Sequence, residues 1–99
     1  MSAAENVIGG LLVDSSAYWR IANLVVEQDF PKSLRPLFAY VRDSLSAGEK
    51  VDAITAWEAG HESAVELAST VYSVANIEAY AKLVAEDGER SRVREAGQR

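Results

Sequence analysis

The sequence predicts an all-α fold, a compact bundle of about six helices in which the last helix is long. Apolar residues recur at helical spacing along most of the chain, and no stretch alternates apolar and polar residues for long enough to form a half-buried strand. The chain has 99 residues and no cysteine, a length that suits one domain without disulfides. We therefore expect residues 1–99 to form a single domain.

The first helix is predicted from about Ala3 to Val13. Ser2 and Glu5 have the spacing of a capping box, and an apolar helical face follows them. Gly9 and Gly10 each weaken a helix by about 1 kcal/mol. We expect the helix to tolerate them if another backbone packs closely there.

The second and third helices are predicted from apolar stripes. Residues 14–16 offer N-caps for the second helix, whose stripe is Tyr18, Ile21, Ala22 and Val25. The segment 27–32 is expected to turn the chain, and Ser33 to cap the third helix, whose stripe is Leu34, Leu37, Phe38, Val41 and Leu45. Pro36 fits the first turn of this helix because its nitrogen has no hydrogen to donate, and Gly48 lies past its end.

Three further helices complete the predicted bundle. Asp52 begins a short fourth helix that carries Ile54 and Trp57 and ends at Gly60. A fifth helix is predicted from about Glu62 to the region of residue 73, with the stripe Val65, Ala68, Val71 and Tyr72. Ser73 is expected to cap the sixth helix, whose stripe is Ile77, Tyr80, Ala81, Val84 and Gly88, continued by Ser91.

The charge is distributed unevenly along the chain. Residues 1–88 carry 13 acids and 6 bases, whereas residues 89–99 carry two acids and four bases and are expected to form a basic, frayed end of the last helix. An acidic body repels nucleic acid, so we expect DNA contact only indirectly or through Arg90, Arg92 and Arg94. No apolar run is long enough to span a bilayer and no export signal is present, which indicates a cytoplasmic protein without membrane contact.

The core is predicted to be small. The chain has 16 alanines, and Leu, Ile, Val and Phe together number 25. A small domain with few large apolar residues gains stability by self-association, so we expect a homodimer or a higher oligomer. Trp19 lies beside the Tyr18 stripe and not on it, which makes it a candidate aromatic anchor directed outward.

Residues that could perform catalysis or hold a cofactor do not form a recognisable site. His61, the only histidine, follows a helix-ending glycine and is expected to be a capping or surface residue, with a Ser63–His61–Asp arrangement as the alternative. Glu62 and Glu66 share a helix face but lack the Glu-x-x-His of di-metal bundles, and residues 47–50 lack the spacing of a P-loop. We therefore expect no catalytic residue, metal or cofactor, and no enzymatic activity.

Five local motifs occur in an order that goes beyond composition and periodicity. They are AENVIGGLLVD at 4–14, Asp29-Phe30, Leu37-Phe38, GEKVDAIT at 48–55 and SVANIEAYAKLV at 73–84. This ordered set resembles the N-terminal domain of the bacterial replicative DNA helicases of the DnaB family over nearly the whole chain. Its most specific part is Ala-Asn-Ile-x-x-Tyr-Ala within the last motif.

The chain departs from the family pattern in three places. The stretch between Trp57 and Val71 is shorter, Lys50 replaces a proline, and the chain ends at Arg99, where the family continues through a helical hairpin and a linker helix into the ATP-driven motor. The resemblance leaves two origins open, a piece of a full helicase or a standalone relative encoded by a phage or prophage.

The resemblance implies a non-catalytic domain that builds a collar on the helicase ring and helps to dock primase. We accordingly expect a protein-interaction and oligomerisation module of DNA replication, whose partners are other copies of itself, helicase subunits or primase. The expected apolar contact residues on the first and last helices are Leu11, Ile77, Tyr80 and Val84, unless these form the core. The alternatives are a standalone modulator of helicase or primase and, more remotely, a small helix-turn-helix DNA-binding regulator centred on Gly60.

Overall fold

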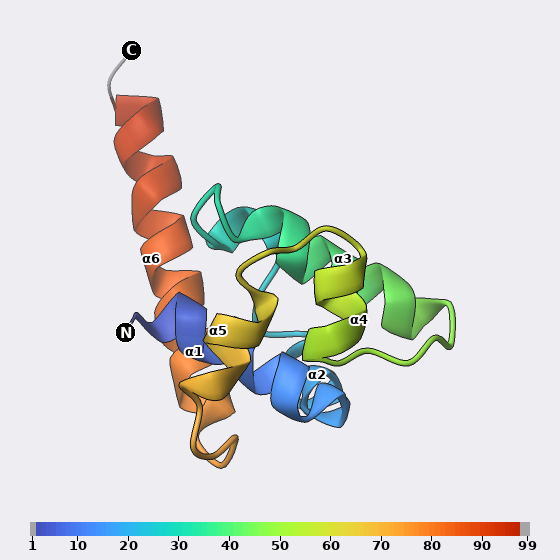
Figure 1. The fold of residues 1–99 in the computed structure, drawn as a ribbon. Helices are drawn as coiled ribbons and strands as arrows, with labels where there is room; N and C mark the ends of the chain where they lie inside the picture. Colours follow the sequence, from blue (N-terminus) through green and yellow to red (C-terminus); the bar gives the residue numbers. More distant parts are fainter. Residues whose placement is uncertain (1, 98–99) are drawn as a thin grey trace.

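The computed structural model describes residues 2–97, and its regular structure consists of six α-helices and two short 3₁₀ helices, with no strand among those residues (Figure 1). In chain order the elements are α1 (Ala3–Val13), η1 (Ser15–Ala17), α2 (Tyr18–Ile21), η2 (Glu27–Asp29), α3 (Arg35–Ser46), α4 (Ala53–Glu58), α5 (Ala64–Ser69) and α6 (Ile77–Gly97). The all-α prediction is confirmed, including the long last helix of 21 residues.

Helix α1 lies at the centre of the fold and packs against α6, α5 and α3. It begins with the expected capping box, in which the Glu5 N–H donates to the Ser2 hydroxyl and the Ser2 N–H donates to the Glu5 carboxylate. These hydrogen bonds lower the pKa of Glu5 below its usual value. A Cβ added at Gly9 would lie 2.5 Å from the Leu67 carbonyl oxygen, so α5 packs closely on this glycine, as the sequence suggested.

The hydrophobic core joins α1 to residues from every other α-helix. The rings of Phe30 and Phe38 stack with centroids 4.6 Å apart, and Tyr18 packs on Phe38 at 6.2 Å. The largest side chains with almost no exposure are Phe30, Phe38, Ile8, Leu11, Ile21, Ile77, Val7, Val41 and Val84. Burial of side chains of this size is the main stabilising term of the fold.

Helix α6 is held along one side of the bundle by two groups of contacts. Figure 1 shows it beside α1, with its C-terminal half projecting past the other helices. In the middle of α6, Gly88 lies against η2, and the Arg92 guanidinium donates to the buried Asp29 carboxylate at 2.9 Å. The other Asp29 oxygen accepts the Val26 N–H at 3.0 Å.

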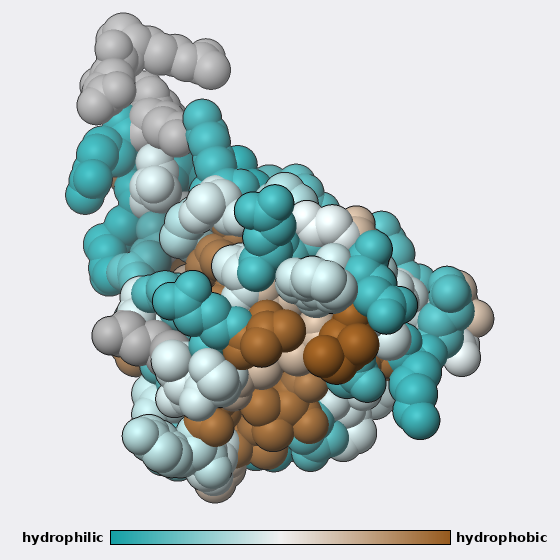
Figure 2. Space-filling view, viewed as in Figure 1, coloured by the Kyte–Doolittle hydropathy of each residue, from teal (hydrophilic) through white to brown (hydrophobic). Residues whose placement is uncertain are grey.

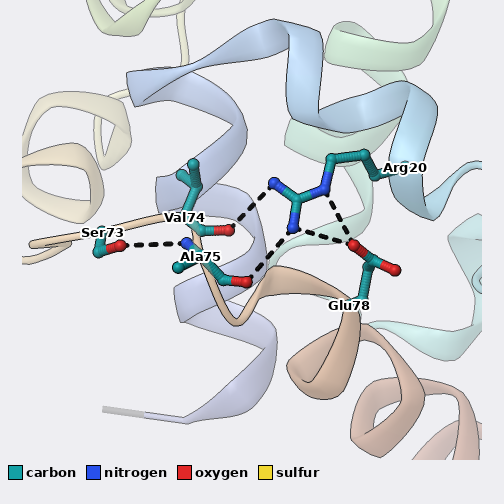
Figure 3. Close-up of polar contacts among 5 residues, drawn as sticks. All are labelled: Arg20, Ser73, Val74, Ala75 and Glu78. Carbon is teal, nitrogen blue, oxygen red and sulfur yellow. Dashed lines mark hydrogen bonds and ion pairs between the residues drawn. The ribbon is translucent and has the colours of Figure 1, made fainter.

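The second group of contacts fixes the segment before α6 to α2 (Figure 3). The Arg20 guanidinium donates to the Glu78 carboxylate and to the carbonyl oxygens of Val74 and Ala75, at 3.0, 3.4 and 3.3 Å from Nε, Nη1 and Nη2. Its planar fork suits several acceptors at once. The Ser73 hydroxyl accepts the Ala75 N–H at 3.1 Å, so Ser73 forms a turn within the connection and is not the N-cap of α6 that we predicted.

Other helix boundaries also differ from the prediction, among them the end of α5, which is Ser69 and not the region of residue 73. The second helix was expected to include Val25 but ends at Ile21, and Val25 reaches the core from a non-helical segment. The N-cap of α3 is Leu34 and not Ser33, although Pro36 and Gly48 take their expected places at its two ends. Helix α6 continues through residues 89–97 as a regular helix, and residues 98 and 99 of the expected basic end lie outside the described residues.

The apolar faces of α4 and α5 also differ from the prediction. Val65 of the stripe predicted for the fifth helix is exposed on α5, and Tyr72 of the same stripe is fully exposed beyond it. Ile54 and Trp57, the apolar residues expected on α4, are exposed as well. The inward positions are taken by Ala56 on α4 and by Ala64 and Leu67 on α5. The two helices thus bury mainly small residues and leave larger apolar side chains outside.

Candidate protein-interaction surface

Exposed apolar side chains gather on α4 and α5, which pack against each other. Ile54 and Trp57 lie one turn apart on α4 and are 58% and 55% exposed, and Val65 on α5 is 44% exposed. Figure 2 shows apolar surface in the middle of the face that these helices form, with hydrophilic surface around it. We call Ile54, Trp57 and Val65, with the neighbouring carboxylates Glu58, Glu62 and Glu66, the α4–α5 surface.

The capping residues of α4 determine which of its side chains face outward. The Thr55 N–H donates to the Asp52 carboxylate at 2.8 Å, and the Asp52 N–H donates to the Thr55 hydroxyl at 2.9 Å. This capping box begins the helix with Ala56 directed into the core. Residues two positions away on a helix lie on different faces, so Ile54 is directed outward.

The end of α4 reverses the chain and brings α5 alongside. Gly60 has φ +103, a left-handed conformation that favours glycine and ends the helix. The His61 N–H then donates to the Ala56 carbonyl oxygen at 3.0 Å, and the His61 ring packs against the Tyr40 ring with centroids 5.1 Å apart. His61 therefore joins the turn to α3, in agreement with a capping or surface role.

The α4–α5 surface is acidic. Residues 51–81 contain five Asp or Glu residues and neither Lys nor Arg. Glu58, Glu62 and Glu66 are exposed and form no ion pair with the side chains of residues 2–94, the part of the chain whose side chains are described. Phosphate groups are bound through Lys and Arg, so this charge does not suit the helix-turn-helix DNA-binding arrangement considered for these two helices.

The five residues predicted to contact a partner lie in different environments. Leu11, Ile77 and Val84 are buried in the core, and Tyr80 is half-buried against it. These positions are covered by the chain itself. Trp19 is 61% exposed and lies edge-on to the Tyr18 ring at 5.1 Å, so the structure directs it outward as expected.

The arginines of α6 are mostly engaged within the chain. Arg92 pairs with Asp29 and Arg90 pairs with Asp87, although all three arginines, Arg94 included, are exposed to solvent. Two of the three arginines considered for DNA contact thus have carboxylate partners. The pair with Asp29 fastens the projecting part of α6 to η2.

A cleft of about 350 Å³ lies between the start of α1, η2 and the middle of α6. Its buried carboxylate, Asp29, already accepts hydrogen bonds from Arg92 and Val26. Among residues 2–94 no buried side-chain polar atom lacks a hydrogen-bond partner. The cleft therefore offers no unpaired buried group to a polar ligand, and the α4–α5 surface is the stronger candidate for binding.

The described residues contain neither a candidate metal site nor a candidate membrane span. No group of three or more His, Asp or Glu side chains among them could hold a metal ion. No helix among them is both long enough and apolar enough to cross a bilayer.

Comparison with known proteins identifies the family. Residues 1–86 match the family model of the DnaB-like helicase N-terminal domain. The fold is similar to the crystal structure of the N-terminal domain of DnaB helicase from Mycobacterium tuberculosis, with a TM-score of 0.87 and 28% sequence identity over 97% of this chain and 78% of that one. A search of curated protein sequences finds no match. The ordered motifs, the all-α fold and the family match agree, and the chain belongs to the DnaB-like helicase N-terminal domain family.

Proposed function

We propose that this chain is a non-catalytic protein-interaction and oligomerisation module of DNA replication. Its family is the N-terminal domain of the helicase, which is not the catalytic motor. The proposed partners are other copies of the chain, helicase subunits or primase, in the cytoplasm. Any contact with DNA is indirect or passes through Arg90, Arg92 and Arg94.

The main support for this proposal is that large apolar side chains are exposed on a chain of the helicase N-terminal domain family. Ile54, Trp57 and Val65 are not needed to fill the core, because Ala56, Ala64 and Leu67 occupy the inward positions of the same helices. Contiguous exposed apolar surface marks interaction sites, and tryptophan is enriched among the residues that dominate binding. The exposed Trp19 adds a second position of the same type.

Sedimentation and capture experiments test the proposal. Analytical ultracentrifugation at micromolar concentration should show dimers or larger species, and the immobilised chain should retain purified replicative helicase or primase from its source organism. The two variants Trp19→Ser and Trp57→Ser should reduce one or both signals, whereas Val26→Ser, an exposed apolar residue next to η2, serves as the matched control. A strictly monomeric chain that retains neither protein would refute the proposed function.

A further inference from the structure

The apolar part of the α4–α5 surface has the layout of a site for a helix. Ile54 and Trp57 are spaced by about one turn on α4, and Val65 is exposed on α5, which packs against α4. A partner helix buries side chains at i, i+3, i+4 and i+7 on such a surface. A partner strand has no place to add, because the described residues contain no sheet edge.

The charged part of the surface indicates what borders the partner's apolar stripe. Glu58 follows Trp57 and Glu66 follows Val65, so each carboxylate lies about 100° round its helix from an exposed apolar side chain. Glu62 lies in the turn between the two helices. The three carboxylates are thus exposed on the same two helices and in the turn between them, and residues 51–81 contain neither Lys nor Arg.

We propose that the α4–α5 surface binds an amphipathic helix of a partner protein whose apolar stripe is bordered by Lys or Arg residues. This inference rests on the proposed function and specifies the chemistry of the partner at this surface. The apolar stripe covers Ile54, Trp57 and Val65, and the basic residues pair with the three carboxylates at the rim. Rim charges of this kind accelerate association and select among partners.

Other occupants fit the surface less well. A second copy could offer the projecting part of α6, but residues 86–94 contain three acids and three arginines, and two of those arginines are paired within the chain. That segment has no net positive charge. DNA and anionic membranes carry phosphate groups, which the three carboxylates repel.

Two synthetic peptides of about 14 residues, or four helical turns, test the inference with the full chain. Both carry Leu at i, i+3, i+4 and i+7, one with Lys on the two flanks and the other with Glu there. Calorimetric titration at low salt should show binding of the Lys peptide at least about tenfold tighter than that of the Glu peptide, because several rim pairs each contribute a small amount. The difference should shrink as salt screens the charges.

Three variants locate the binding. Trp57→Ser should lower the affinity for the Lys peptide about 30-fold, which is the loss expected when a residue that dominates binding is removed. The triple variant Glu58→Lys, Glu62→Lys and Glu66→Lys should reverse the preference so that the Glu peptide binds better. Glu89→Lys, on the projecting part of α6, should change neither affinity, and circular dichroism should confirm that every variant is folded.

The outcomes separate this inference from the proposed function. Equal binding of the two peptides, no binding of either, or an unchanged preference in the triple variant would overturn the inference. If the wild-type chain and the triple variant retain helicase or primase equally well, the module function stands and another surface carries it. If Trp57→Ser abolishes self-association while neither peptide binds, a second copy occupies the surface and the inference is wrong.

Discussion

Replacing Gly88 with alanine tests whether close backbone packing holds α6 against η2. At a solvent-exposed helix position the change from Gly to Ala stabilises a helix by about 1 kcal/mol. Gly88 is buried, and a Cβ built there would lie 2.4 Å from the Asp29 Oδ1 atom and 2.5 Å from the Asp29 Cα atom. Helix propensity and packing therefore predict opposite signs for this substitution.

The magnitude follows from the contacts that must move. An ordinary contact begins at 3.4 Å, so α6 and Asp29 must separate by 0.9 Å, and one of the colliding atoms is backbone. Overpacking of this kind costs about 1 to 3 kcal/mol. The shift also disturbs the two hydrogen bonds of the Asp29 carboxylate, at about 1 to 3 kcal/mol for a buried polar group. The higher helix propensity of alanine offsets part of these two costs. We therefore expect the free energy of unfolding to fall by about 2 kcal/mol. This value lies in the lower part of the summed range because Arg92, one of the two donors to Asp29, is half-exposed.

Urea unfolding and thermal unfolding followed by circular dichroism measure this loss. For a domain of this size, about 2 kcal/mol corresponds to a fall in Tm of about 8 to 16 °C. Glu89→Ala compared with Glu89→Gly gives the propensity difference at an exposed neighbour on the same helix, where alanine should be more stable by about 1 kcal/mol. If Gly88→Ala is as stable as the wild type or more stable, with an unchanged m value, the close packing of α6 on Asp29 is not what the structure indicates.

Three further substitutions have effects that unfolding experiments can measure. Ser2→Ala should lose about 1 kcal/mol because it removes the hydroxyl that accepts the Glu5 N–H. The backbone N–H of residue 2 still donates to the Glu5 carboxylate, so both proteins should lose stability as pH falls through the lowered folded-state pKa of Glu5, and most of the difference between them should persist in acid. Gly9→Ala should destabilise more than Gly10→Ala, since the first Cβ meets a backbone oxygen at 2.5 Å and the second meets movable side-chain atoms at 3.2 Å or more. Arg20→Lys should cost about 1 kcal/mol because an ammonium cannot replace the forked contacts with one carboxylate and two carbonyls, and loss of hydrogen-exchange protection at the start of α6 should accompany it.

The long helices could be predicted from the sequence because their patterns repeat over several turns. The capping box at Ser2 fixes the start of α1, and the stripe from Ile77 to Gly88 correctly predicts which face of α6 is covered. The sequence predicted that another backbone packs closely on Gly9. It could not show that this backbone belongs to α5, because the tertiary fold decides which helices meet.

The boundaries that were wrong have local physical causes. Val25 and Val26 are β-branched, and the Val26 N–H is taken by the Asp29 carboxylate, so the chain leaves the helical path before Val25 although Val25 is buried. At the end of α5, the hydroxyls of Ser69 and Thr70 donate to carbonyl oxygens three residues back. Such side-chain hydrogen bonds compete with the helical ladder and end α5 well before the expected residue 73.

The candidate interaction surface could not be predicted because α4 and α5 are each only six residues long. Less than two turns cannot define a periodic stripe, so the side on which Ile54 and Trp57 lie could not be read from the sequence. On the fifth helix the predicted stripe included Val65 and Ala68, whereas Ala64 and Leu67 are the buried residues. A different signal was present in the same segment, since residues 51–81 combine Ile54, Trp57 and Val65 with five acids and neither Lys nor Arg. A helix face that packs in the core does not require an excess of acidic residues beside it. A surface that selects a basic partner does require such an excess. The same bias explains why the Glu-to-Lys triple variant is the decisive test, because it changes partner preference and leaves Ala56, Ala64 and Leu67 packed as before.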